Sequence, residues 1–288
     1  MFKKLNKKGE LTTQQIVLLI ILIASFAVIL FFILKLNLGQ QTVQEICHNS
    51  VIMRGSSVVP TDAVPLKCKR QYVCLSLDGS CEKMTKPELI KVKTENEVYK
   101  VLTEEMAECW WMFGEGKINY VGSDTTPTLY CSICSQIVFD NSVKDLFNGA
   151  NSFDKKKLYD YMANEKRSDG KTYLQYLFKV NNMDQIYLGN FGEVDFDMQH
   201  YSLVGIWSET SEWTWAGIGA VVFVAGAVTG GAGWIVGSLA FVAGGGAGYF
   251  IGPVVVGDSG NNYIPPSLIE VNSEEFYGLE CNLITTAS

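Results

Sequence analysis

The order of two features constrains this chain most. An uncharged apolar run, Ile16 to Leu34, comes first, and all of the cysteines follow it. Nineteen helical residues rise about 28 Å, close to the hydrocarbon thickness of a bilayer. Four lysines precede the run, and basic residues of this kind stay in the cytoplasm. We therefore expect a transmembrane helix with its N-terminus in the cytoplasm and the chain after about Asn37 outside the cell membrane.

The cysteines form an even set on the outer side of the expected membrane helix. An oxidising compartment favours disulfide formation, so most of them are expected to be paired. Eight cysteines allow about 105 pairings, and the sequence does not choose among them. The candidates are Cys47, Cys68, Cys74, Cys81, Cys109, Cys131, Cys134 and Cys281.

The charge distribution argues against nucleic acid as a partner. The whole chain has a formal net charge of −7, although several of its basic residues lie before the apolar run, so the part beyond that run is more acidic still. An acidic surface repels phosphate backbones. The partners expected instead are the lipid bilayer, further copies of the chain and other envelope proteins.

The residues before the apolar run carry a family resemblance. Lys7-Lys8-Gly9-Glu10-Leu11-Thr12-Thr13-Gln14-Gln15 leads directly into the run. This segment resembles the class III signal of archaeal type IV pilin-like membrane proteins, over about the first 35 residues. The resemblance implies peptidase cleavage between Gly9 and Glu10, followed by anchoring or filament assembly through the apolar helix. Many family members have glutamate at the position of Gln14. The alternative is an uncleaved anchor whose lysines only set its orientation.

Residues 38–212 predict a mixed helix-and-strand domain. Residues 38–92 read as short strands and turns held by disulfides, with a strand at Tyr72–Leu77 that enters a hairpin turn at Asp78-Gly79. Cys81 would close a small loop with Cys68 or Cys74. A capping box at Thr94-Glu95-Asn96-Glu97 starts a helix with an apolar stripe.

Further elements are expected along the same domain. Asp140 or Asn141, and later Ser152, look like caps of two helices, with the lysines at 155–157 on a solvated face. The remaining expectations for this domain are a short helix from Tyr173 to Phe178, strands at 186–188 and 201–207, and an outer strand face for Asp195 and Asp197. A further strand at 268–271 is expected in the C-terminal tail.

Two motifs could carry chemistry. The pair Trp110-Trp111 could stack on a ligand or a sugar, but one of the two falls on the buried stripe, which favours core packing. Cys131-Ser132-Ile133-Cys134 permits a redox dithiol, half of a zinc site or two structural half-cystines. Strand-like flanks and the lack of a second ligand pair favour the structural reading. No catalytic, cofactor-binding or metal-binding residue is predicted, and the common reaction motifs are absent.

A second apolar block, residues 213–257, contains no charge and many glycines. Its length suits a helical hairpin of two crossings, and glycines spaced by four let helix backbones approach closely. The alternatives are a hairpin that inserts into membranes later and a buried glycine-rich sheet or helix pair. The predicted helix-packing residues are Gly226, Gly230, Gly233, Gly237, Gly244, Gly248 and Gly252.

The predicted fold class is therefore α+β, with an N-terminal transmembrane helix, a disulfide-rich extracytoplasmic domain of mixed helices and strands, and a C-terminal apolar helical hairpin. The expected divisions are a leader (1–9), the transmembrane helix (10–37), a cysteine-rich region (38–92), the mixed domain (93–212), the hairpin (213–257) and a tail (258–288) that Cys281 ties to the domain. This architecture predicts a non-enzymatic envelope protein of structural, adhesive or assembly role. A membrane-active protein using the hairpin and an anchored thiol oxidoreductase using Cys131 and Cys134 are the alternatives.

Overall fold

The computed structural model describes residues 13–35, 42–56, 64–122, 128–183, 190–208, 221–224, 235–241 and 249–284. The chain divides into two compact units, residues 1–42 and residues 43–288, which we call the body. The predicted processing residues Gly9 and Glu10 lie outside the described residues.

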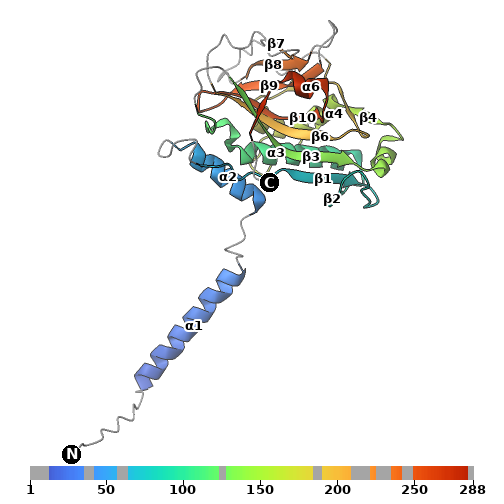
Figure 1. Cartoon of the computed structure of the whole chain (residues 1–288). Coiled ribbons are helices and arrows are strands. Elements are labelled where there is room, and N and C mark those ends of the chain that lie inside the picture. The colour runs from blue at the N-terminus through green and yellow to red at the C-terminus, as the bar shows by residue number, and fades with distance from the viewer. Residues whose placement is uncertain are drawn as a thin grey trace, which may run out of the picture. The chain divides into compact units, whose positions relative to one another are not determined.

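The first unit contains one helix, α1 (Thr13–Lys35), which is the blue helix nearest the N-terminus in Figure 1. Its apolar side chains are exposed on every side, from 44% for Ile16 to 64% for Leu18. The predicted transmembrane helix is nevertheless wrong, because no helix within the described residues is long and apolar enough to cross a membrane.

The body is built on one mixed sheet. Its strands follow the order β2-β1-β3-β6-β10-β9-β8-β7, and β11 pairs with β3 beside this path. Strands β1, β2 and β11 run parallel to their neighbours, and the other pairs are antiparallel. The strands are β1 (Gln71–Ser76), β2 (Glu88–Lys91), β3 (Leu129–Phe139), β6 (His200–Trp207), β7 (Val221–Val224), β8 (Ile235–Phe241), β9 (Tyr249–Val256), β10 (Asn262–Glu270) and β11 (Asn282–Leu283).

Helices cover this sheet, and a small hairpin lies beside it. The hairpin pairs β4 (Ser152–Asp154) with β5 (Glu193–Asp195). Figure 1 shows α3 running along the sheet beside β3. The helices of the body are α2 (Val43–Arg54), α3 (Glu95–Met112), η2 (Gly114–Gly116), η3 (Asn141–Phe147), α4 (Lys155–Asn164), α5 (Tyr173–Phe178) and α6 (Glu274–Gly278).

The long strand β3 separates two apolar cores. Leu129 and Ile133 belong to a smaller core with Phe276 of α6, whereas Ile137 and Phe139 belong to the larger core with α3. Alternation along a strand would give all four odd-numbered residues the same face. The pairing of β3 with β6 shifts register between Ile133 and Ser135, and such a bulge exchanges the two faces of a strand. One strand therefore contributes to both cores.

The glycine-rich block contradicts the helical-hairpin prediction. Its described residues form strands β7, β8 and β9, which continue the sheet beyond β10. Gly237 and Gly252 lie within β8 and β9, opposite Val254 and Leu239. Short apolar runs suit a buried strand as well as a helix, and cross-strand pairing with β10 favours the strand here. Gly226, Gly230, Gly233, Gly244 and Gly248 lie outside the described residues.

Several predicted elements are confirmed. The strands near 72–77, 201–207 and 268–271 appear in β1, β6 and β10, and the helix from Tyr173 to Phe178 is α5. Helix α3 begins after Thr94, whose side chain accepts a hydrogen bond from the Glu97 amide at 3.2 Å. The Glu97 carboxylate accepts from the Lys93 amide at 2.6 Å, so the second hydrogen bond of the predicted capping box is made to the residue before the cap.

Other elements differ from the prediction. The turn after β1 does not make a hairpin, because β1 and β2 pair in parallel. The second predicted cap is Asp154 rather than Ser152, which lies in β4. Lys155 is buried, so it does not lie on the predicted solvated face. Helix α2 occupies part of the region that the sequence predicted to contain strands and turns. The predicted strand at 186–188 lies outside the described residues.

A buried histidine makes the stability of the body depend on pH. Burial lowers the pKa of His200 to about 3, and the charge of Lys155 lowers it further, while a hydrogen bond with the Met198 backbone acts in the opposite direction. The folded state therefore binds fewer protons than the unfolded state between pH 3 and the ordinary histidine pKa of about 6.5. The contribution of His200 to the free energy of unfolding is fully present above about pH 6.5 and is lost as the pH falls.

Replacing His200 by phenylalanine should make the free energy of unfolding depend less on pH in the acid range. At pH 5 the titration of His200 lowers the free energy of unfolding of the wild type by about 2 kcal/mol, because only the unfolded state binds a proton on this ring. His200→Phe removes this loss, because phenylalanine binds no proton. Urea unfolding between pH 4.5 and pH 7.5 measures the slope. The matched control is His48→Phe, since the chain has two histidines. An unchanged slope in His200→Phe would show that other groups cause the acid sensitivity.

Candidate functional site

All eight cysteines are paired, which confirms the predicted disulfides. Cys74–Cys81 closes the small loop after β1, and Cys47–Cys68 joins α2 to the segment before β1. Cys109–Cys134 joins α3 to β3, and Cys131–Cys281 joins β3 to the C-terminal tail. No free cysteine remains. The disulfide of Cys281 therefore joins the tail to the body.

The Cys131/Cys134 pair is structural in this arrangement. Cys131 lies before the step at which the register of β3 changes and Cys134 lies at it, and their side chains enter different cores. Cys131 belongs to the smaller core and bonds Cys281, whereas Cys134 belongs to the larger core and bonds Cys109. A redox dithiol needs these two sulfurs to bond each other, and here each has another partner.

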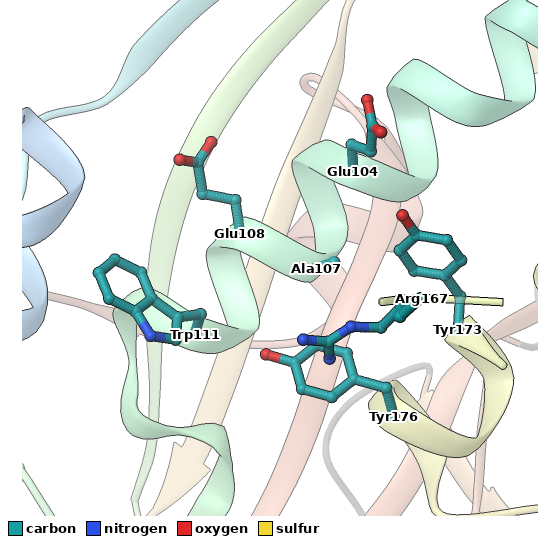
Figure 2. A pocket seen from close by; sticks show the side chains of 7 residues that line it. All are labelled: Glu104, Ala107, Glu108, Trp111, Arg167, Tyr173 and Tyr176. Carbon is teal, nitrogen blue, oxygen red and sulfur yellow. The ribbon is translucent and has the colours of Figure 1, made fainter. Parts of the chain in front are cut away.

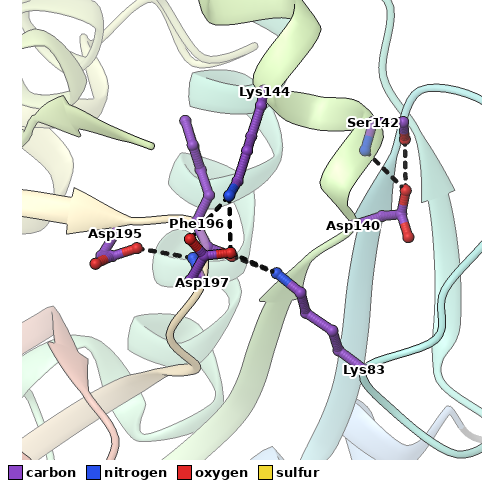
Figure 3. A network of polar contacts seen from close by, with 7 residues as sticks. All are labelled: Lys83, Asp140, Ser142, Lys144, Asp195, Phe196 and Asp197. Atoms are coloured by element: carbon purple, nitrogen blue, oxygen red, sulfur yellow. Dashed lines mark hydrogen bonds and ion pairs between the residues drawn. The ribbon is translucent and has the colours of Figure 1, made fainter. Parts of the chain in front are cut away.

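A polar network near the end of the β4–β5 hairpin explains the acidic pair in that region (Figure 3). Lys144 Nζ lies 2.8 Å from both carboxylate oxygens of Asp197, and Lys83 Nζ lies 3.4 Å from one of them. The Asp197 amide donates to Asp195 at 2.8 Å. The hydrogen bond from Lys144 lowers the pKa of Asp197, so this carboxyl stays ionised. The network ties η3 to the hairpin and gives Asp197 a structural role.

One pocket in the described part of the chain lies beside α3 and has a volume of about 300 Å³. Helix α3 supplies four lining residues at positions 104, 107, 108 and 111, which share one face because they are spaced by three and four. Helix α5 and the turn before it supply the opposite wall, and Figure 2 shows the two groups facing each other. The lining residues are Glu104, Ala107, Glu108, Trp111, Arg167, Tyr173 and Tyr176.

The tryptophan pair divides between the core and this pocket. Trp110 is fully buried and packs edge-on against Tyr263, as the core prediction expects for one member of the pair. Trp111 lines the pocket and stacks on His48 of α2, with ring centroids 4.1 Å apart. The His48 Nδ1 atom also donates to the Trp111 carbonyl at 2.7 Å. The ring of Trp111 is therefore held on one side and borders the pocket.

Arg167 is placed by a tight turn before α5. Its amide donates to the Lys171 carbonyl at 2.8 Å, and its carbonyl accepts from Gly170 at 3.0 Å. The guanidinium carbon lies 3.3 Å from the centre of the Tyr176 ring, which is a close cation–π contact. The Nη1 atom is buried and makes no hydrogen bond within the described residues. This leaves a guanidinium with unused donor capacity in the pocket wall.

A hydrogen bond to Glu115 holds the Tyr176 side chain. Its hydroxyl donates to Glu115 at 2.8 Å, and Glu115 also forms an ion pair with Lys117. Burial raises the pKa of Glu115, but the hydrogen bonds from Lys117 and Tyr176 outweigh burial and lower it overall. Burial and the bond to Glu115 raise the pKa of Tyr176, so the phenol stays neutral. The Tyr176 ring against Arg167 is therefore neutral and is held by a hydrogen bond to Glu115.

The two glutamates that line the pocket differ in how exposed their side chains are. Glu104 is exposed and lies 3.9 Å from Lys100, whereas Glu108 is partly buried. Burial raises the pKa of Glu108, and a hydrogen bond with Gln71 partly offsets this. Glu105, on the adjoining face of α3, has its pKa raised to about 7, mainly by burial. The pocket thus combines two carboxyl groups, one guanidinium and three aromatic rings.

The described residues contain no group of three or more histidine, cysteine, aspartate or glutamate side chains that could hold a metal ion. The sequence did not predict Arg167, Tyr173 or Tyr176 as site residues. The available signal was the spacing of Glu104, Glu108 and Trp111 along one outward face of the predicted helix.

Comparison with known proteins identifies no family that matches the chain, no curated protein significantly similar in sequence and no solved structure significantly similar in fold.

Proposed function

We propose that this chain is a non-enzymatic protein of the cell envelope, with a disulfide-bonded body in an extracytoplasmic compartment and an apolar helix, α1, that attaches it there. The observation that carries this proposal is the pairing of all eight cysteines. Disulfides persist in oxidising compartments and are rare in the cytosol. The body has a structural, adhesive or assembly role in this proposal.

Helix α1 supports attachment. A helix that is apolar on every side has no face suited to water and needs apolar surroundings. Helices of further copies, or of other envelope proteins, can supply them. The resemblance of residues 7–15 to the pilin-like signal supports the same role, since the helix of that family assembles after cleavage of the leader. The predicted cut between Gly9 and Glu10 belongs to this proposal.

Intact mass of the protein from its native envelope tests the compartment. The sample is alkylated under denaturing conditions without reduction. We expect no alkyl groups, because every cysteine is paired, and a mass that lacks residues 1–9 if the leader is cleaved. A reduced sample, which should take up alkyl groups at each cysteine, is the control. Two or more alkylated cysteines without reduction would contradict an oxidising location.

Charge placed on α1 tests attachment. Leu18→Lys combined with Leu22→Lys should release the chain from the envelope fraction, because two buried ammonium groups would be costly in apolar surroundings. The matched control is Met53→Lys with Met198→Lys, which changes two exposed side chains of the body. Fractionation and chemical cross-linking measure the result. If the α1 variant stays in the envelope fraction and cross-links as the wild type does, α1 is not the attachment element.

A further inference from the structure

We propose that the pocket between α3 and α5 binds a neutral saccharide, with the sugar ring against the aromatic side chains and its hydroxyl groups on Glu104, Glu108 and Arg167. This inference goes beyond the envelope role and does not depend on it. A saccharide site could be present whether or not α1 attaches the chain.

The pocket carries charges of both signs, so an ion of either sign meets a repelling group as well as an attracting one. Glu104 and Glu108 repel an anion such as a phosphate or a carboxylate, and Arg167 repels a cation. Within the described residues Arg167 has no ion pair, so its charge is not cancelled by a protein carboxylate. A ligand that carries neither charge meets no such repulsion.

The hydrogen-bonding groups select for hydroxyls. An ionised carboxylate only accepts hydrogen bonds, and a guanidinium only donates them. A hydroxyl group does both, so an array of hydroxyls can satisfy both sides of this pocket. The Nη1 atom of Arg167 has no partner in the described structure, so the guanidinium in the pocket wall keeps donor capacity that the protein does not use.

The aromatic side chains complete the selection. A sugar ring has an apolar face of C–H groups that packs against an aromatic ring. Trp111 and Tyr173 are partly exposed where they border the pocket, and His48 holds Trp111 in place from its other face. Ala107 leaves open the space between these walls. The volume of about 300 Å³ lies at the lower end of the range for small-ligand pockets and suits one or two rings.

Direct binding measurements test the proposal. The full-length chain is kept in a detergent without a sugar head group, because α1 is apolar. The neutral compounds are maltose, cellobiose, lactose and diacetylchitobiose, and the charged ones are glucuronate and glucosamine. Saturation-transfer NMR detects binding, and tryptophan fluorescence measures affinity. We expect at least one neutral disaccharide to bind with a Kd of about 0.1–10 mM, as suits an open pocket with few contacts.

Matched variants locate the site. Arg167→Ala should weaken binding about tenfold or more, because it removes the donor side of the pocket. Arg70→Ala is the control, since Arg70 also lies over a tyrosine ring, that of Tyr201, and does not line the pocket. Its affinity should match the wild type. If Arg167→Ala fails to fold, Ala107→Met tests the same site by filling the space between the walls while keeping a good helix former.

The carboxylates are tested by a change of ligand class. Glu104→Gln with Glu108→Gln leaves Arg167 as the only charged residue of the lining, so glucuronate should bind this variant about tenfold more tightly than the wild type. Three results would each overturn the proposal. They are no saturation transfer from any neutral compound at about 10 mM, neutral binding that survives both Arg167→Ala and Ala107→Met, and tighter binding of a charged sugar than of every neutral one by the wild type.

Discussion

Removing the Cys131–Cys281 disulfide should destabilise the body more than removing any other. The two residues are 150 apart in the sequence, whereas the other disulfides join residues 7, 21 and 25 apart. A cross-link restricts the unfolded chain more strongly when it closes a longer loop. The loop-entropy relation gives about 5 kcal/mol for this disulfide and about 2 kcal/mol for Cys74–Cys81.

The measurement compares two double variants, Cys131→Ala/Cys281→Ala and Cys74→Ala/Cys81→Ala, by urea unfolding without reductant. Alanine avoids burying a serine hydroxyl at Cys131, which is fully buried. The tail variant should also lose the short strand β11, since Leu283 pairs with Cys131 itself. Hydrogen exchange of the Ile284 amide, which donates to the Cys131 carbonyl at 2.9 Å, reports this loss. Equal destabilisation of the two variants would refute the loop-length argument.

The second large effect separates two adjacent tryptophans. Trp110→Ala should lower the free energy of unfolding by about 3–5 kcal/mol, because the side chain is fully buried and alanine leaves a cavity in the larger core. The Trp110 ring also loses its edge-on contact with Tyr263, whose ring centre lies 5.9 Å away. Urea unfolding measures the change.

Trp111→Ala is the matched comparison, since it removes the same side chain from the next residue of the same helix. Trp111 is only partly buried and its main ring contact is the stack on His48, so we expect a loss of about 1 kcal/mol. Saccharide binding should show the opposite order, with Trp111→Ala the more damaging change in the folded protein. Similar stability losses for the two variants would contradict the assignment of Trp110 to the core and Trp111 to the pocket wall.

Local sequence signals predicted the elements whose structure depends on neighbours in the chain. The threonine cap and apolar stripe located α3, and the alternating or β-branched runs located β1, β6 and the end of β10. The even cysteine set after the apolar run predicted that most cysteines are paired, and the structure pairs all eight. These signals suffice because capping, periodicity and redox compartment act within one segment or on the whole chain at once.

The glycine-rich block shows where local signals fail. Periodicity and glycine spacing there fit a helical hairpin, but the described residues join β10 as additional strands. Pairing with a distant strand supplies hydrogen bonds that an isolated segment lacks, and it overrides a weak helix preference that several glycines already reduce. The parallel pairing of β1 with β2 and the buried position of Lys155 have the same kind of cause.

The pocket also depends partly on local sequence and partly on tertiary structure. The sequence by itself determined that Glu104, Glu108 and Trp111 share a helix face, because that follows from 3.6 residues per turn. Only the tertiary structure placed Arg167 and the α5 tyrosines opposite this face, since a turn some 60 residues later in the chain brings them there. It also chose one of the many cysteine pairings, because the two faces of β3 present Cys131 and Cys134 to different partners.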